Sequence, residues 1–205
     1  METAAPLATV EEPTTASTHR RRLFEGMARA VAAQGFAACT IADIVREAAV
    51  SRRTFYEHFQ TKADCLIAMY ESASRNALRQ LQAMLDPTRH WQQQVEGAMT
   101  AYLGVLADNP VVLRALFIDI LSLGTEGLAA RRRVNHEIAE FLLSVVNPKR
   151  DHAVMSPTMA MAVVGGINEL VLQLIEQDRI GDMQSIADTT SALIRAVVGG
   201  EVPRG

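Results

Sequence analysis

Side chains that suit contact with DNA gather in one short segment, residues 51–58 (SRRTFYEH). Arg donates paired hydrogen bonds to guanine or contacts phosphate, while Thr, Tyr and His contact base edges or phosphate oxygens. Phe55 and Phe59 recur at i, i+4 and should point into a core. The remaining faces of the predicted helix would then carry Arg52, Arg53, Thr54, Tyr56 and His58. This pattern predicts a helix that reads DNA.

The residues around this helix predict two short helices joined by a tight turn. Thr40 and Asp43 have the spacing of a capping box, and Ser51 is a favoured N-cap residue for the reading helix. The turn falls at Ala49-Val50. Thr61 and Asp64 repeat the capping box, which places Lys62 in the first turn of a further helix. The apolar face of the first short helix consists of Ile41, Ile44, Val45 and Ala48.

Residues 40–62 resemble the DNA-binding domain of TetR-family transcriptional repressors. That family has a Thr before its second helix, a small-Gly-Val-Ser turn, an aromatic–Tyr pair and a Phe in its third helix, and a Lys opening the fourth. The matching positions are Thr40, Ala48-Ala49-Val50-Ser51, Phe55-Tyr56, Phe59 and Lys62. The resemblance is strong over residues 19–70, and beyond them only length and helical pattern match. Ala49 stands where the family usually has Gly. If this residue has a positive φ, alanine would destabilise the turn by about 1 kcal/mol relative to glycine.

Charge is distributed as expected for a DNA-binding head on an acidic body. The chain has a net charge of −3, but residues 19–62 hold eight Arg and Lys against four Asp and Glu. Residues 20–22 (RRR) begin the first helix and either are solvated or contact phosphate; we favour phosphate. The predicted DNA-contact set is Arg20, Arg21, Arg22, Thr40, Ser51, Arg52, Arg53, Thr54, Tyr56, His58 and Lys62.

The remaining sequence predicts an all-α protein of about nine helices. We expect a disordered arm over residues 1–18, a three-helix DNA-binding domain over 19–65, and a helical ligand-binding and dimerisation domain over 66–205. Further helices are expected at 62–85, 91–107, 111–123, 125–146, 157–177 and 183–198, with breaks at Pro and Gly residues. No stretch shows convincing strand alternation.

The last two predicted helices are apolar on more than one face, which requires two partners each. A homodimer formed through a four-helix bundle is the simplest account, and it is the usual interface within the TetR resemblance. The competing account makes the helix at 157–177 the centre of a monomer's core. Gly165-Gly166 in that helix predicts close approach of another helix.

A small-molecule pocket is expected among the middle helices, because apolar residues there have a few polar neighbours. Such residues are more often ordinary core. The predicted lining is Trp91, Met99, Tyr102, Leu106, Phe117, Ile120, Leu121, Phe141 and Asn168. Residues 131–133 (RRR) are expected on an exposed helix face, with a second nucleic-acid site as the alternative.

Other functional classes find little support. The chain has no HExxH, GxGxxG, GxSxG or P-loop motif, and its five His have no metal-ligand spacing. We therefore expect no enzyme activity, no cofactor and no metal. Cys39 and Cys65 form no CxxC pair, which favours a reducing, cytoplasmic location and a packing role over redox sensing. The longest apolar run, Met159–Ile167, is too short to span a membrane.

The sequence thus predicts a homodimeric regulator that binds a palindromic double-stranded DNA operator. We expect a repressor that is released by a mostly apolar small molecule. One alternative is a DNA-binding regulator without a small-molecule ligand. Another is a helical interaction module whose basic segment binds an acidic protein.

Overall fold

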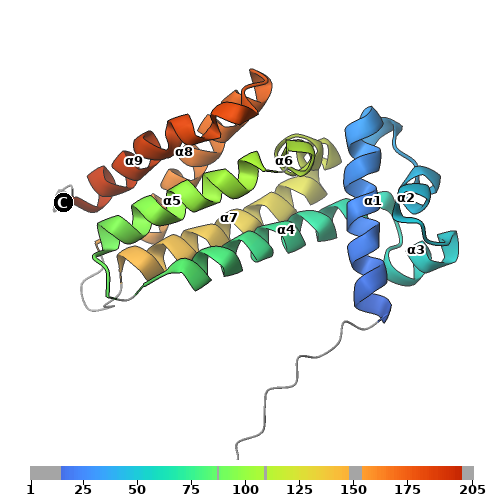
Figure 1. Cartoon of the computed structure of the whole chain (residues 1–205), viewed down its shortest axis with the longest axis horizontal. Coiled ribbons are helices and arrows are strands. Elements are labelled where there is room, and N and C mark those ends of the chain that lie inside the picture. The colour runs from blue at the N-terminus through green and yellow to red at the C-terminus, as the bar shows by residue number, and fades with distance from the viewer. Residues whose placement is uncertain (1–14, 87, 109, 148–153, 200–205) are drawn as a thin grey trace, which may run out of the picture.

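The computed structural model describes residues 15–86, 88–108, 110–147 and 154–199, and within these ranges every regular element is helical. The predicted all-α fold is confirmed. A head made by α1–α3 joins a helical body, and α4 runs from one into the other (Figure 1). The α-helices are α1 (Thr15–Ala38), α2 (Ile41–Ala48), α3 (Arg52–His58), α4 (Lys62–Met84), α5 (Trp91–Ala107), α6 (Pro110–Phe117), α7 (Thr125–Val146), α8 (Pro157–Glu176) and α9 (Ala187–Gly199). Two 3-10 helices, η1 (Asp119–Leu123) and η2 (Ile180–Ile186), complete the described fold.

Side-chain caps start the short helices of the head where the sequence predicts them. The Thr40 hydroxyl accepts a hydrogen bond from the Asp43 amide at 3.2 Å, and the Asp43 carboxylate accepts one from the Thr40 amide at 3.0 Å. Ser51 caps α3 by accepting from the Thr54 amide at 3.0 Å. Thr61 begins α4 with a second complete capping box. These caps satisfy amides that the first turn of a helix leaves unpaired.

The first helix differs from its predicted limits at both ends. It begins at Thr15, four residues before the predicted start at residue 19, so residues 15–18 are helical rather than part of an arm. The rest of the predicted arm, residues 1–14, lies outside the described residues. Gly35 has φ 75°, ψ 160° and breaks the helix where a C-cap was predicted, and a short helical segment follows to Ala38.

Two of the predicted body helices are each divided. The helix predicted at 111–123 ends at Phe117 and is followed by η1. The division fits close packing: a Cβ added to Gly127 would lie 1.8 Å from the Ile120 carbonyl oxygen, so α7 passes directly against the η1 backbone. The helix predicted at 183–198 is η2 followed by α9.

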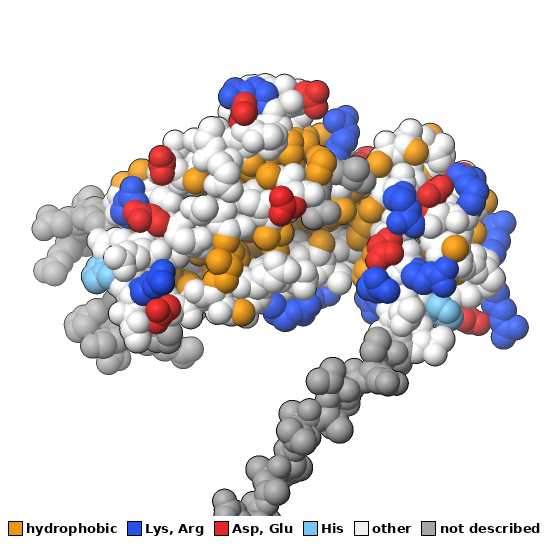
Figure 2. Space-filling view, viewed as in Figure 1, with side chains coloured by type: hydrophobic (Ala, Val, Ile, Leu, Met, Phe, Trp, Pro, Cys, Tyr) orange, Lys and Arg blue, Asp and Glu red, His pale blue; other side chains and the backbone are white. Residues whose placement is uncertain are grey.

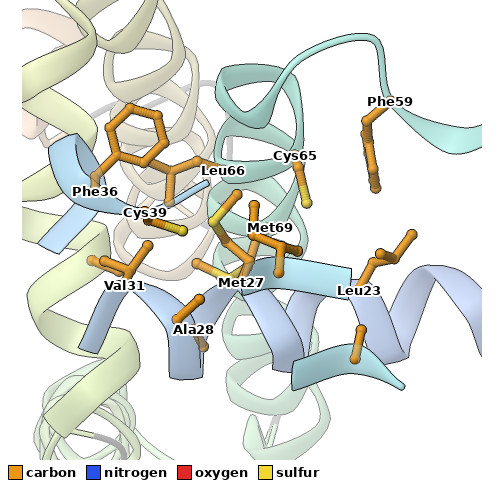
Figure 3. Packing of buried hydrophobic residues seen from close by; sticks show 14 of the residues in the cluster. Leu23, Met27, Ala28, Val31, Phe36, Cys39, Phe59, Cys65, Leu66 and Met69 are labelled. Atoms are coloured by element: carbon orange, nitrogen blue, oxygen red, sulfur yellow. The ribbon is translucent and has the colours of Figure 1, made fainter. Parts of the chain in front are cut away.

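The core of the head packs α1 against α2, α3 and the first turns of α4. Leu23, Met27 and Leu66 have no exposed surface and belong to the cluster drawn in Figure 3. Phe55 of α3 is equally buried in this core. Cys39 and Cys65 are free thiols buried in the same core. Burial raises the pKa of both thiols, that of Cys65 to about 12, which disfavours the reactive thiolate form. These observations support the packing role of both cysteines.

Helix α8 forms the apolar centre of the body. Val163, Val164, Ile167 and Val171 are buried, and α8 packs against α7 and α9. By length and composition alone α8 also qualifies as a possible membrane span, although 44% of its most apolar window is buried inside the protein. A buried core helix meets the same two criteria, so packing accounts for its composition.

Candidate DNA-binding surface and body cavity

Helix α3 presents Arg52, Arg53 and Tyr56 to solvent. The side chain of Arg53 is 89% exposed and forms an ion pair with Glu57 at 3.1 Å. Arg52 lies over the ring of Tyr56, 5.8 Å from the centroid, and its guanidinium donates a long hydrogen bond of 3.4 Å to the Tyr56 hydroxyl. The exposed ion pair contributes little to stability. Both Arg side chains are therefore free to exchange these contacts for DNA.

The other polar residues of this region mainly act within the protein. The hydroxyls of Thr40 and Ser51 cap α2 and α3, and the Thr54 hydroxyl lies 2.8 Å from that of Ser51. The ring of His58 meets that of His19 edge to face, with centroids 6.3 Å apart. Hydrogen bonds from Thr40 hold the pKa of Asp43 well below its ordinary value, so the capping carboxylate stays charged.

The three consecutive Arg of α1 have three different environments. The Arg20 guanidinium lies over the rings of Phe24 and Phe59, 5.5 and 5.9 Å from their centroids. Arg21 forms an exposed ion pair with Glu25 at 3.0 Å. Arg22 is half-buried and donates to the carbonyls of Ala48 and Ala49, at 3.0 and 2.6 Å. Arg22 thus holds the turn before α3, while Arg20 and Arg21 remain exposed and available for phosphate.

Lys62 also forms contacts within the head. Its Nζ donates to the carbonyls of Phe36, Ala37 and Cys39, at 2.8, 3.1 and 2.7 Å, and lies 4.5 Å from the centroid of the Phe36 ring. An ammonium group has three donors, and all three are used here. A phosphate contact by Lys62 remains a prediction, and it would require the loss of at least one of these bonds.

The turn before α3 has the conformation in which glycine is favoured. Ala49 has φ 50° and ψ 48°, in the left-handed region. The positive φ considered from the sequence is therefore present. Arg22 holds the Ala49 carbonyl, and Arg29 donates to the carbonyl of the nearby Glu47. Two Arg side chains thus hold carbonyls at the end of α2 and in the turn that leads to α3.

Charge separates the head from the body in space as well as in sequence. Lys and Arg side chains cover much of the visible face of the head, whereas hydrophobic side chains line the middle of the body between α5 and the pair α4 and α7 (Figure 2). A basic surface of this kind attracts the phosphate backbone of DNA, and the attraction weakens as salt rises.

The body contains two adjoining cavities. An apolar cavity of about 60 Å³ lies among α4, α5, α7, α8 and α9, and a mixed cavity of about 280 Å³ lies among α4, α5, α6, α7 and α8. Six of the nine residues predicted to bind a ligand line one or both: Met99, Tyr102, Leu106, Phe117, Phe141 and Asn168.

The other three predicted lining residues lie elsewhere. Trp91 is partly buried at the start of α5, Ile120 is fully buried in a cluster with Tyr70 and Val134, and Leu121 packs against that cluster. Ile120 and Leu121 belong to η1 rather than to a continuous helix, so helical spacing from α6 mispredicted their direction.

Sequence reasoning missed several polar lining residues. Tyr70, Ser74, Asn76, Arg131 and Asn135 all line the mixed cavity. Arg131 was expected on an exposed helix face because it belongs to a run of three Arg. The i, i+4, i+7 series Arg131, Asn135, Ile138 was the available signal, since residues at this spacing share one face of a helix.

Helix α6 connects the mixed cavity to the head. Its Leu113, Leu116 and Phe117 line the cavity, while Ala115 is buried in the head core. Just beyond α6, the Asp119 carboxylate accepts a hydrogen bond of 3.3 Å from the Phe36 amide in α1. Burial raises the pKa of Asp119, while the Phe36 hydrogen bond and Arg114 act in the opposite direction. A change in the shape of the mixed cavity that moves α6 would therefore also move the contacts that α6 and Asp119 make with the head.

The head has relatives at the level of sequence. Residues 24–69 match the family model described as bacterial regulatory proteins, tetR family. Over 79 residues the chain is 29% identical to the uncharacterised HTH-type transcriptional regulator YxbF of Bacillus subtilis (strain 168). That match covers 38% of this chain and only 21% of the relative's length.

The fold of the described chain is similar to that of solved regulators. The transcriptional regulator FadR from Bacillus subtilis, solved in complex with stearoyl-CoA, has a TM-score of 0.75 at 13% identity, covering 89% of this chain and 99% of that one. A TetR-like transcriptional regulator from Rhodococcus sp. RHA1 has a TM-score of 0.66 at 16% identity, covering 89% and 97%. At these identities the likeness shows the fold. Residues 24–69 thus match the DNA-binding part of the tetR family, and the described chain as a whole has the fold of solved regulators.

Proposed function

We propose that this protein is a tetR-family regulator: a cytoplasmic, homodimeric repressor that leaves a palindromic operator when a mostly apolar small molecule binds its body. The exposed face of α3 is the observation that carries the DNA-binding part. Arg52, Arg53 and Tyr56 are all exposed there, on a head whose charge is net basic. In a helix-turn-helix domain the second helix enters the major groove.

The proposed dimer uses one outward face of α8 and α9. Small and apolar residues are exposed on this face: Met159, Ala162, Gly165, Ala192, Leu193 and Ala196. A Cβ added to Gly165 would meet nothing within 4 Å, so this position offers room for a neighbouring helix, whereas Gly166 already faces Leu193 of its own chain. Two copies related by a two-fold axis would present two α3 helices about one turn of DNA apart.

The body cavities support the effector part of the proposal. They are largely apolar with a few polar groups, which is how small-molecule sites are built. A solved regulator of similar fold was in complex with stearoyl-CoA. Because α6 lines the mixed cavity and also enters the head core, a ligand that prefers another position of α6 would move the head. Such coupling lowers operator affinity about 5- to 150-fold in typical cases.

The head and body described here are proposed to act as separate domains. The boundary falls within α4, because Cys65, Leu66 and Met69 belong to the head core while Leu81 lines the apolar cavity. The proposed limits, residues 19–65 and 66–205, cut this continuous helix near its start. A shared helix of this kind would let movement in the body change the separation of the two heads.

The DNA-binding proposal is tested by selecting duplex fragments from a random library and measuring their affinity by fluorescence anisotropy. We expect an approximately palindromic site. Replacement of the base-reading Arg, either R52A or R53A, should cost about 1–3 kcal/mol at one operator position and relax the preference there. R46A, on the exposed side of α2, is the matched control. Equal losses for R52A and R53A on every sequence would make both of them phosphate contacts, and no binding by the wild type at low salt would refute the proposal.

A further inference from the structure

The two cavities of the body adjoin; the mixed cavity forms a polar end and the apolar cavity an apolar end. Leu78, Tyr102, Ile138 and Asn168 line both, so the cavities adjoin across these side chains. Beyond them, the apolar cavity is lined only by hydrophobic residues. The mixed cavity adds the polar residues Tyr70, Ser74, Asn76, Arg131 and Asn135. A ligand that occupies both cavities therefore needs one polar and one apolar end.

The apolar end is narrow. Its volume is about 60 Å³, against about 280 Å³ for the mixed cavity. Val95, Met99, Val164 and Ile194 are buried around it, and they come from three different helices. A small apolar cavity that is lined mainly by aliphatic side chains, with the rings of Tyr102 and Phe141 beside them, admits a flexible alkyl chain more readily than a rigid ring system. This geometry favours a chain of moderate length.

Arg131 supplies the charge at the polar end. It is half-buried on α7, and within the described part of the chain it forms neither a hydrogen bond nor an ion pair. Its neighbour Arg133 differs, because Arg133 donates two hydrogen bonds to Glu71, at 2.9 and 2.7 Å. A half-buried guanidinium without a counter-charge is costly, and an anion in the cavity would remove that cost.

The surroundings of Arg131 place its charge beside the cavity wall. Tyr70 and Arg131 both line the mixed cavity, and the Arg131 charge opposes the rise that burial causes in the pKa of Tyr70. The carboxylates of Glu71 and Glu137 also act on Tyr70. Glu71 is already bound by Arg133, and Glu137 does not line either cavity. Arg131 is thus the cation that lines the mixed cavity.

Further donors lie between Arg131 and the apolar end. Asn168 donates from Nδ2 to Oδ1 of Asn135 at 3.0 Å, which leaves the Asn135 amide hydrogens without a partner among the described residues. The Tyr102 hydroxyl likewise has no hydrogen-bond partner in the described ranges, although it lines both cavities. Arg131 and Asn135 are one turn apart on α7. Their donors can therefore converge on the same anionic group.

We propose that the effector is an amphipathic anion: an alkyl chain that ends in a carboxylate or in a phosphate-bearing head. Arg131 and Asn135 bind the anionic group, and the chain passes Tyr102 and Asn168 into the apolar cavity. This inference depends on the proposed effector function and specifies the ligand class for it. The single Arg in the lining selects against neutral compounds with the same chain.

The test compares decanoate with decanol, which has the same chain length but no charge. Isothermal titration calorimetry on the full-length protein should show decanoate binding at least tenfold more tightly than decanol. R131Q should lose at least tenfold in decanoate affinity while its decanol affinity is unchanged. R132Q is the matched control, because Arg132 is exposed on the same helix and lines neither cavity. Equal affinities for decanoate and decanol in the wild type would overturn the inference.

A second arm identifies the source of the anion. If decanoyl-coenzyme A binds more tightly than decanoate and R131Q weakens it at least tenfold, the phosphates or the pantetheine arm belong to the ligand. If decanoate binds more tightly, the free carboxylate is recognised. If R131Q weakens neither ligand, Arg131 is not the anchor and the inference is wrong.

Thermal unfolding separates a binding role of Arg131 from a structural one. Without ligand, R131Q should melt at the wild-type temperature or above it, because the substitution removes an unpaired, half-buried charge. A lower melting temperature would show that Arg131 supports the fold instead. Operator affinity measured in parallel keeps the two proposals distinct. Normal operator binding with no response to any of the three ligands refutes only the ligand class, whereas failure of the wild type to bind any duplex refutes the proposed function itself.

Discussion

The head and the body are stabilised in different ways. In the head, α2 and α3 have only 8 and 7 residues, and their ends are held by charged side chains. Arg22 and Arg29 bind carbonyls at the end of α2, and Lys62 binds three carbonyls at the end of α1. In the body, α4, α5, α7 and α8 have 17 to 23 residues, and together with the shorter α6 and α9 they pack apolar faces and leave two cavities between them. Polar tethers fix the geometry of the head, whereas the body retains room to change shape.

This difference suits the proposed division of labour. A DNA-reading helix must keep its direction, because a small displacement breaks hydrogen bonds to base edges. An effector site must have at least two shapes of similar free energy, or the ligand has nothing to select. A partly empty apolar cavity allows two shapes of similar free energy, because the side chains that line it lose fewer packing contacts when the helices move. The following substitutions test whether the head is as rigid, and the body as tolerant, as this comparison implies.

The largest effect is expected from a methyl group at the contact between α1 and α2. A Cβ on Gly26 would lie 2.7 Å from the Ala48 Cβ, the Ala48 amide nitrogen and the Ile44 carbonyl oxygen. Because two of these atoms are backbone, G26A should destabilise the head by about 3 kcal/mol and abolish operator binding. Chemical denaturation followed by circular dichroism measures the first effect, and anisotropy with a labelled operator the second.

The matched control is a glycine in the body. Gly97 is exposed within α5, and a Cβ there would meet nothing within 4 Å. G97A should therefore stabilise the protein by up to about 1 kcal/mol through helix propensity, and it should leave operator affinity unchanged. If G26A retained wild-type stability, the α1–α2 contact would have freedom that the structure does not show.

The helices of the head were also predicted more accurately from the sequence than those of the body, because the signals that start them lie close together in the chain. Thr40 with Asp43, Ser51, and Thr61 with Asp64 are caps that work within four residues, so spacing alone predicted where three helices begin. The tethers made by Arg22 and Lys62 were not predicted, because each spans 23 to 27 positions in sequence. Arg22 was expected to contact DNA as part of a basic run at the start of the first helix, and Lys62 from its position in the TetR-like pattern.

In the body, contacts between residues far apart in sequence limit the prediction more strongly. The break between α6 and η1 is set by α7 passing against Ile120 and by the Asp119 contact with Phe36, and no Gly or Pro at residue 118 announces it. A cavity is a property of how five helices meet, so apolar spacing identified six lining residues but also three that lie elsewhere. Arg131 was missed because a run of three Arg is typical of a solvated surface.

The second expected effect concerns Lys62. Replacement by Met keeps most of the side-chain volume and removes three hydrogen bonds to carbonyls. We expect K62M to destabilise the protein by about 2 kcal/mol, since hydrogen bonds to charged groups contribute more than neutral ones. Denaturant unfolding measures this. The dependence of operator affinity on salt then decides whether Lys62 also touches phosphate. A slope lower by about one unit would place it at the DNA, and an unchanged slope would leave it a structural tether.

The third prediction tests the body as a dimer. G165L places a large side chain on the exposed face of α8 at a position with no neighbour within its own chain. If that face packs against a second copy, the dimer dissociation constant should rise at least tenfold, about 1.4 kcal/mol, by analytical ultracentrifugation. G97L adds the same side chain to an exposed glycine of α5 and should leave association unchanged. A G165L protein that associates as strongly as the wild type would locate the interface elsewhere.

The smallest expected effect is a gain in stability within the head. Ala49 holds φ 50° in the turn before α3, where an L-residue pays a steric cost that glycine does not. A49G removes that cost but also makes the unfolded chain more flexible, so the net gain should be at most about 1 kcal/mol. A42G, at an exposed position inside α2, is the control and should lose up to about 1 kcal/mol, because there glycine only lowers helix propensity. If A49G raises the free energy of unfolding and A42G lowers it, the strain lies in the backbone of the turn at Ala49. It would then not be a general effect of replacing Ala by Gly in this region. If A49G also stabilises without changing operator affinity, the direction of α3 is set by the Arg22 and Arg29 tethers; if affinity falls, the strained alanine itself helps to orient the reading helix.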